Sequence, residues 1–292
     1  MSDTPVQEHD YKAEVEDSGR WRQLQHRPGD VFVCTAPKNG TTWTQAICSL
    51  LIFGDPNAPS GSGTISPWVE LTLDPIDDMN ARLAAQTHRR FIKSHAPMDG
   101  IIWWEDAVYL AVCRHPLDMY FSLLKHGENQ TDPVDNPIYN VDRAQSFDYW
   151  LNEPLRPDPT NNTILSAAVH HFKSFRKWQH LSNVHLLHYA DMTRDLHTEM
   201  SKVAVALDIS HPPELMDQLV EAATFDSMKK NAEKHAPEVH DDFWKDKGNF
   251  FHSGTSGKWH GKLTEDQLAA YDARMDSLLS PEERRWLEWG SV

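Results

Sequence analysis

The strongest constraint on the fold is a repeated order of short apolar runs and helical patterns. Residues 31–35 form an apolar run, and apolar side chains then recur at helical spacing over residues 41–53. The same order returns at residues 108–113, and further strand-like runs lie at residues 90–93 and 184–189. This alternation predicts an α/β fold with a central, mainly parallel sheet flanked by helices, whose ligands bind outside the carboxyl ends of the strands.

The second half of the chain combines helical patterns with one irregular segment. Residues 164–181 return to helical periodicity, whereas residues 127–162 contain many prolines, asparagines and aspartates and are interpreted as an irregular excursion. Two capping boxes predict the starts of C-terminal helices, Thr264 with Gln267 and Ser280 with Glu283.

Length sets the expected domain organisation. A chain of 292 residues can bury one large core, so we expect a single domain over residues 1–292. We interpret residues 1–29 as an N-terminal extension. Residues 127–162 and 235–258 are interpreted as lid segments that cover a site.

Charge and hydropathy exclude several classes of partner. The net charge of −15 argues against a nucleic-acid partner, because nucleic acids attract basic surfaces. The longest apolar stretches, residues 50–53 and 108–113, are too short to cross a bilayer, which predicts a cytoplasmic protein without integral membrane association. The histidine pair His170–His171 and the cluster around His235 lack a recognised ligand spacing, so no metal site is expected.

The loop between residues 35 and 41 has the residue types of an anion site. Gly40 allows close approach of a ligand to the backbone, and the following helix start presents unpaired N–H groups. Lys38, Thr41 and Thr42 add a cation and two hydroxyls. The segment is not the nucleoside-triphosphate loop, because Lys38 precedes the glycine. An ordinary strand-to-helix turn is the alternative interpretation.

Three segments carry a resemblance to one family. Residues 35–43, T-A-P-K-N-G-T-T-W, resemble the 5′-phosphosulfate loop T-x-P-K-x-G-T-T-W of the sulfotransferases that use 3′-phosphoadenosine 5′-phosphosulfate (PAPS). Residues 113–122, C-R-H-P-L-D-M-Y-F-S, are similar to that family's 3′-phosphate segment, and residues 91–97, F-I-K-S-H-A-P, to its catalytic segment K-[ST]-H-x-P. The chain is therefore identified as resembling the cytosolic-type PAPS-dependent sulfotransferases over about residues 31–267.

The resemblance implies a fold, a reaction and catalytic residues. The fold is a P-loop-like nucleotide-binding core. The reaction moves a sulfuryl group from PAPS, as co-substrate and without a metal, to a hydroxyl or, less often, an amine of a small molecule or lipid. His95 is implied as the base that takes the acceptor's proton, with Lys38 and Lys93 stabilising charge. Ser122 is implied to contact both the 3′-phosphate and Lys38.

The resemblance also implies a set of nucleotide-binding residues. Aromatic faces suit a flat purine. The implied residues are Lys38, Asn39, Gly40, Thr41, Thr42, Trp43, Arg114, Ser122, Tyr189, Phe225, His252, Ser253 and Gly254.

The sequence departs from the family near its end. His252 stands where the family has an arginine, and Ser253 and Gly254 match the R-S-G of many bacterial members, which makes a bacterial member the expectation. Histidine lacks the permanent charge of arginine, so we expect weaker and more pH-dependent binding of the 3′-phosphate, with Lys258 as a candidate for compensation. The dimerisation pattern of animal members is not reproduced at residues 260–269, so a homodimer stays open.

Two other function classes stay open at this stage. A P-loop-like nucleotide kinase would share the sheet but needs a lysine directly after the loop glycine. A non-catalytic nucleotide-binding homologue would explain the arginine replaced by His252. Aromatic residues such as Trp68 and Trp104 are compatible with many acceptors, so the sequence does not identify the acceptor.

Overall fold

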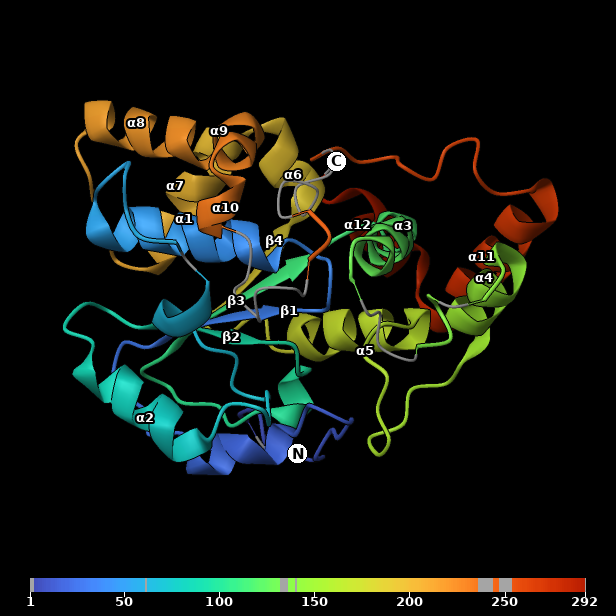
Figure 1. Cartoon of the computed structure of the whole chain (residues 1–292), viewed down its shortest axis with the longest axis horizontal. Coiled ribbons are helices and arrows are strands. Elements are labelled where there is room, and N and C mark those ends of the chain that lie inside the picture. The colour runs from blue at the N-terminus through green and yellow to red at the C-terminus, as the bar shows by residue number, and fades with distance from the viewer. Residues whose placement is uncertain are drawn as a thin grey trace.

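A parallel sheet forms the centre of the molecule (Figure 1). The structure, a computed structural model, describes residues 3–60, 62–131, 136–139, 141–235, 244–246 and 254–291. Within these residues the sheet has four strands in the order β2-β1-β3-β4, and all three pairings are parallel. The strands are β1 (Val31–Thr35), β2 (Phe91–Ser94), β3 (Val108–Cys113) and β4 (Val184–His188).

Helices cover both faces of this sheet (Figure 1). Successive side chains of a strand point to opposite faces, so Val31 and Val33 of β1 pack under α1, α7 and α8, whereas Phe32 packs on the other side against Trp21 and Met79. Burial on both faces explains why the strands read as continuous apolar runs. The three helices on the first face are α1 (Thr41–Phe53), α7 (Leu196–Ala206) and α8 (Pro213–Ala223). Met79, on the other face, belongs to α2 (Ile76–Ala85).

A third packing region joins the remaining long helices beside the sheet. Its buried members include Tyr120, Trp150, Phe172 and Tyr271, which come from four different helices. These and the other described helices are α3 (Pro116–Glu128), α4 (Arg143–Asn152), α5 (Leu165–Arg176), α6 (Tyr189–Arg194), α9 (Phe225–Lys230), α10 (Ala232–His235), α11 (Glu265–Leu278) and α12 (Pro281–Trp289), with 3-10 turns at Ser18–Gln23, Gly63–Ile65 and Met98–Gly100.

Much of the predicted element order is confirmed. The strands at residues 31–35 and 108–113 and the helix at residues 41–53 have the predicted bounds. Both capping boxes form, at Thr264 and at Ser280. The predicted α/β class with a parallel sheet is therefore the observed fold.

The interpretation of residues 127–162 as wholly irregular is wrong, because α4 lies within it. Asp142 caps this helix by accepting hydrogen bonds from the backbone N–H groups of Ala144 and Gln145. Phe147 and Trp150 then bury their rings against Tyr120. Tertiary packing and a cap therefore stabilise a helix within a segment whose composition favours turns.

N-terminal residues 15–21 pack against the segment around Glu70 and against one face of the sheet. The backbone N–H of Asp17 donates to the carbonyl of Glu70, and that of Thr72 donates to the carbonyl of Val15. Trp21 is fully buried, and its Nε1 donates to Glu70 at 2.6 Å. This segment therefore contributes to the core.

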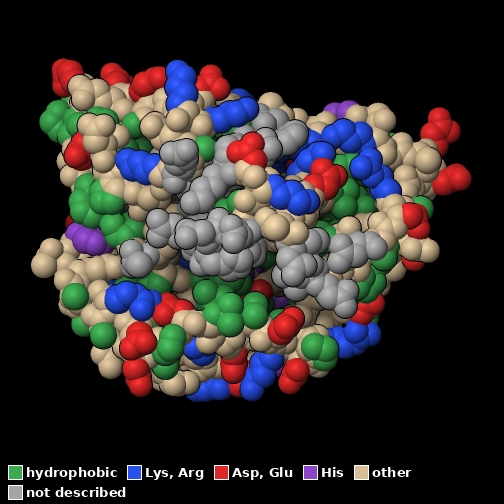
Figure 2. Space-filling model, in the orientation of Figure 1, with side chains coloured by type: hydrophobic (Ala, Val, Ile, Leu, Met, Phe, Trp, Pro, Cys, Tyr) green, Lys and Arg blue, Asp and Glu red, His purple; other side chains and the backbone are tan. Residues whose placement is uncertain are grey.

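The surface is mixed in charge. Acidic and basic side chains are interspersed over the face shown in Figure 2. No helix within the described ranges combines the length and apolar character that a bilayer span requires.

Candidate active site

The loop after β1 is shaped around Gly40, the residue before α1. Gly40 has φ 102°, and a Cβ at this position would lie 3.1 Å from Cδ2 of Tyr189. Only glycine adopts this conformation and leaves that space without strain. Among the described residues no side chain caps the start of α1, so its first N–H groups are suited to an anion. In the same loop, the hydroxyls of Thr35 and Thr41 lie 2.5 Å apart.

Arg114, directly after β3, reaches across this loop. Its Nη1 donates to the carbonyl of Lys38 at 3.1 Å, and its Nη2 donates to the carbonyl of Thr255 at 3.2 Å. The guanidinium carbon lies 4.1 Å from the centre of the Tyr189 ring. The side-chain Nε is buried and finds no hydrogen-bond partner among the described residues, so a donor remains for a ligand.

Two lysines add positive charge beside Arg114. Burial, reinforced by Arg114 and Lys258, lowers the pKa of Lys38 to about 7. Burial and Arg114 likewise lower the pKa of Lys258 to about 8. The Nζ of Lys38 lies 3.1 Å from Nδ1 of His126 on α3. Buried cations that repel one another are stabilised by a bound anion, so this cluster has the electrostatics of a phosphate site.

Aromatic side chains lie next to the cationic cluster. The rings of Trp43 and Tyr189 meet edge to face with centroids 5.2 Å apart. Phe225 packs with Trp43 against one small apolar cluster. Gly254 lies against the Phe225 ring, because a Cβ there would come within 2.2 Å of its Cδ2. The structure thus brings together the residues expected to hold the purine.

Asp118 fixes the segment that carries Gly254 and Thr255, and sequence reasoning did not single it out. Its carboxylate accepts hydrogen bonds from the backbone N–H groups of Gly257 at 2.8 Å and Lys258 at 2.7 Å. It is fully buried in the first turn of α3. The available signal was a carboxylate among apolar residues within the segment of residues 113–122, four residues after Arg114.

The remaining predicted nucleotide residues are placed as follows. Asn39 is buried, and its Oδ1 has no hydrogen-bond partner in the described part of the chain. Thr42 lies in the first turn of α1. Ser122 lies on α3 one turn before His126, and the contact that we expect between Ser122 and Lys38 stays a prediction. His252 and Ser253 lie outside the described residues.

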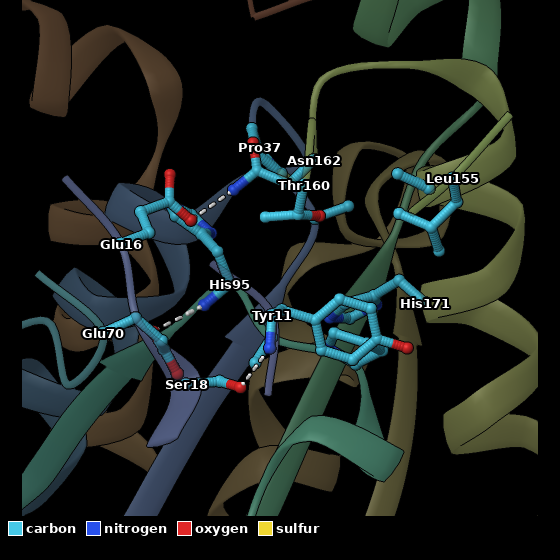
Figure 3. A pocket seen from close by; sticks show the side chains of 14 residues that line it. Tyr11, Glu16, Ser18, Pro37, Glu70, His95, Leu155, Thr160, Asn162 and His171 are labelled. Atoms are coloured by element: carbon cyan, nitrogen blue, oxygen red, sulfur yellow. Dashed lines mark hydrogen bonds between the residues drawn. The ribbon is translucent and has the colours of Figure 1, made fainter. Parts of the chain in front are cut away.

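His95 lies just past the end of β2 and faces a cavity (Figure 3). Its Nδ1 lies 2.6 Å from the carbonyl oxygen of Thr35, and its backbone N–H donates to Glu70 at 3.2 Å. A carbonyl only accepts, so Nδ1 carries the proton and the lone pair is on Nε2. Burial and then the charge of Lys93 lower the pKa of His95 well below 6.5, which keeps the imidazole neutral.

Lys93 approaches the same region from β2. Its Nζ lies 4.0 Å from the centre of the Trp68 ring, and the same ring meets His95 edge to face at 4.9 Å. Burial lowers the pKa of Lys93 to about 8, while Glu16 and Glu70 oppose that shift. His95 and Lys93 therefore both contact the Trp68 ring, as expected for residues two apart that lie on one side of an extended strand, although Lys93 itself does not line the cavity.

The cavity at His95 is small and mostly enclosed by segments that the motifs do not include. Its volume is about 20 Å³, enough for one water-sized group such as a hydroxyl. The N-terminal segment supplies Tyr11, Glu16 and Ser18 to its wall, and α5 supplies His171. In the described residues no three metal-ligating side chains of His, Cys, Asp or Glu come together.

Comparisons with known proteins identify one family. A family model described as "Sulfotransferase domain" matches residues 28–282. A curated relative, "Glycolipid sulfotransferase" of Mycobacterium tuberculosis, is 32% identical over 306 residues, which cover 96% of this chain and 94% of the relative. "Sulfotransferase 1B1" of Mus musculus is 26% identical and covers 87% of this chain and 84% of its own length.

Solved structures share the fold. A mouse sulfotransferase, SULT7A1, complexed with PAP superposes with a TM-score of 0.70 and 21% identity over 92% of this chain and 90% of its own. A retinol dehydratase in complex with androsterone and the inactive cofactor PAP gives a TM-score of 0.69 with 17% identity over 91% and 87% of the two chains. The match of the family model over residues 28–282 and the relative at 32% identity show that the chain belongs to the sulfotransferase domain family.

Proposed function

We propose that this sulfotransferase moves a sulfuryl group from PAPS to an acceptor hydroxyl, with His95 as the general base. The observation that carries the proposal is that a neutral, oriented imidazole and a cationic anion-binding loop meet at Thr35. The carbonyl of Thr35 accepts from Nδ1 of His95, and Lys38 follows three residues later in the loop. A base and an anion site at one point are what in-line sulfuryl transfer requires.

The cationic cluster fits the nucleotide of the donor. Arg114, whose Nε has no hydrogen-bond partner in the described part of the chain, and Lys258 are suited to the 3′-phosphate. The loop around Gly40 and the open start of α1 are suited to the 5′-phosphosulfate. The mouse sulfotransferase and the retinol dehydratase that share the fold are complexed with PAP, the adenosine 3′,5′-bisphosphate that remains after transfer, which supports this assignment.

The reaction follows from these positions. The acceptor oxygen attacks sulfur, a new S–O bond forms, and the bond between sulfur and the 5′-phosphate oxygen breaks. The acceptor's proton passes to Nε2 of His95, the ring nitrogen that has a free lone pair. The charge that develops on the departing phosphate is stabilised by Lys38, whose own pKa rises beside a phosphate.

The acceptor that we propose is a hydroxyl of a lipid or small molecule. The relative at 32% identity is named a glycolipid sulfotransferase, and the match covers 94% of its length. A glycolipid is therefore a reasonable first acceptor to test. The cavity at His95 admits a single hydroxyl-sized group in this state, so the body of the acceptor must lie outside it or widen it.

One experiment separates this proposal from its alternatives. We expect adenosine 3′,5′-bisphosphate to raise the melting temperature without magnesium, and labelled sulfate to pass from PAPS to hydroxylated acceptors. Stabilisation without transfer to any acceptor in a broad screen would support a non-catalytic homologue instead. Stabilisation only by ATP with magnesium would support a nucleotide kinase.

A further inference from the structure

A buried histidine with one unpaired ring nitrogen, as far as the described residues show, lines the acceptor cavity. His171 on α5 is 3% exposed and lines the same cavity as His95. Its Nε2 is buried and makes no hydrogen bond to any described residue. Burial lowers its pKa to about 3, so the ring is neutral. A buried polar atom that is left unpaired costs free energy, which a ligand hydroxyl in the cavity would remove.

A second polar group comes from the N-terminal segment. Glu16 lines the cavity, and its Oε2 accepts a hydrogen bond from Nδ2 of Asn162 at 2.6 Å (Figure 3). The other carboxylate oxygen of Glu16, Oε1, makes no hydrogen bond to a described residue. Burial, reinforced by Glu70, raises the pKa of Glu16 to about 7, so this carboxyl accepts or donates a hydrogen bond near neutral pH.

Neither group is needed for the chemistry. The proton acceptor is His95, and charge on the leaving side is stabilised by Lys38. Glu16 and His171 come from the N-terminal segment and from α5, outside the three motifs that carry the reaction. Polar groups placed in a pocket without a role in the reaction typically fix the orientation and identity of a ligand.

We propose that Glu16 and His171 form a subsite for a second hydroxyl of the acceptor, so that the enzyme selects polyols such as vicinal diols or sugars over simple alcohols. This inference rests on the proposed function, because it places the sulfated hydroxyl at His95. Since the cavity of about 20 Å³ has room for one such group, binding of a diol requires the cavity to widen.

The test compares two ligands that differ by one hydroxyl. Calorimetry on the full chain saturated with adenosine 3′,5′-bisphosphate gives Kd for 1-hexanol and for 1,2-hexanediol. We expect the diol to bind about ten-fold more tightly, the size of one hydrogen bond to a buried polar group. His171→Phe keeps a ring of similar size, and Glu16→Leu removes the carboxyl; each should bring the ratio of the two Kd values close to one.

The controls make the outcome decisive. Glu14→Leu, at an exposed residue of the same segment, should keep the wild-type ratio. Asparagine or glutamine at residue 171 should restore part of the preference, because either amide can bond a hydroxyl. If Glu16→Leu fails to fold, Glu16→Gln replaces it, with a reduced ratio expected. A wild-type ratio near one, binding of neither alcohol, or an unchanged ratio in the folded variants overturns the inference.

Failure of the inference is distinct from failure of the proposed function. Transfer of labelled sulfate from PAPS to any hydroxylated acceptor upholds the function whatever the ratio of the two Kd values.

Discussion

The Nδ1 atom of His95 lies 2.6 Å from the carbonyl oxygen of Thr35, the last residue of β1. This one hydrogen bond links the end of β2 to the loop that begins the anion site. It sets the tautomer of the imidazole, because the carbonyl can only accept. It also holds the base at a fixed position relative to Lys38, three residues further along the chain.

Binding of adenosine 3′,5′-bisphosphate should take up protons at pH 8. The pKa of Lys38 is about 7 in the free protein, and a neighbouring phosphate raises it, so the contribution of Lys38 to affinity is complete below pH 7 and is lost as the pH rises toward the raised pKa. Lys258, with a pKa of about 8, acts in the same direction. Calorimetry in two buffers of different ionisation enthalpy measures the uptake, which Lys38→Met should reduce. Proton release would contradict the placement of these lysines at the phosphates.

Arg114→Met should weaken the binding of adenosine 3′,5′-bisphosphate by about 2–5 kcal/mol, because the substitution removes one partner of a buried charge pair. The binding of adenosine 5′-phosphosulfate, which lacks the 3′-phosphate, should weaken much less. Arg156→Met, at an exposed arginine that is paired with Glu153, is the matched control. Equal losses for both nucleotides would assign Arg114 to another role.

Gly254→Ala should weaken nucleotide binding, whereas Gly261→Ala should leave it unchanged. Both glycines have positive φ, 57° and 71°, so each alanine costs about 1–3 kcal/mol of stability. The methyl group added at residue 254 meets the Phe225 ring, whereas no atom of the described residues lies within 4 Å of the one added at residue 261. Melting temperatures and nucleotide titrations of both variants check this. Equal nucleotide affinity in the two would remove Phe225 from the purine site.

Much of the fold could be predicted because burial leaves a clear mark on the sequence. Strands covered on both faces must be apolar throughout, so β1 and β3 were predicted with the observed bounds. Helix α4 was missed because its cap at Asp142 and its packing on Tyr120 lie in a segment of turn-forming composition. Tyr189 was expected on a strand and instead begins α6, one residue past β4.

The site could be predicted only where residues are adjacent in sequence motifs. The loop at Gly40, Arg114 and His95 stand in three short segments, which the structure brings to one edge of the sheet. His126 and Glu16 act across long distances in the chain and carry no local pattern. Asp118 lies within the Arg114 segment, but its role appears only through its hydrogen bonds with Gly257 and Lys258. His126 meets Lys38 from 88 residues away, a contact that only the folded sheet creates.

Asp118→Asn should weaken nucleotide binding by about 1–3 kcal/mol, because an amide cannot accept from the backbone N–H groups of both Gly257 and Lys258 without turning a donor toward one of them. The segment beside Arg114 then loses its fixed position. Asp77→Asn, in the exposed first turn of α2, is the matched control. Titration with adenosine 3′,5′-bisphosphate measures the effect, and an unchanged affinity would show that Asp118 only stabilises the fold.

The central claim is that a neutral His95 takes the acceptor's proton. Single-turnover transfer of labelled sulfate from PAPS, measured for the wild type and for His95→Ala with an acceptor that the wild type uses, tests it most directly. The account predicts a loss of about 10²–10⁴-fold in the rate of transfer, with affinity for adenosine 3′,5′-bisphosphate nearly unchanged. A rate close to that of the wild type would contradict it.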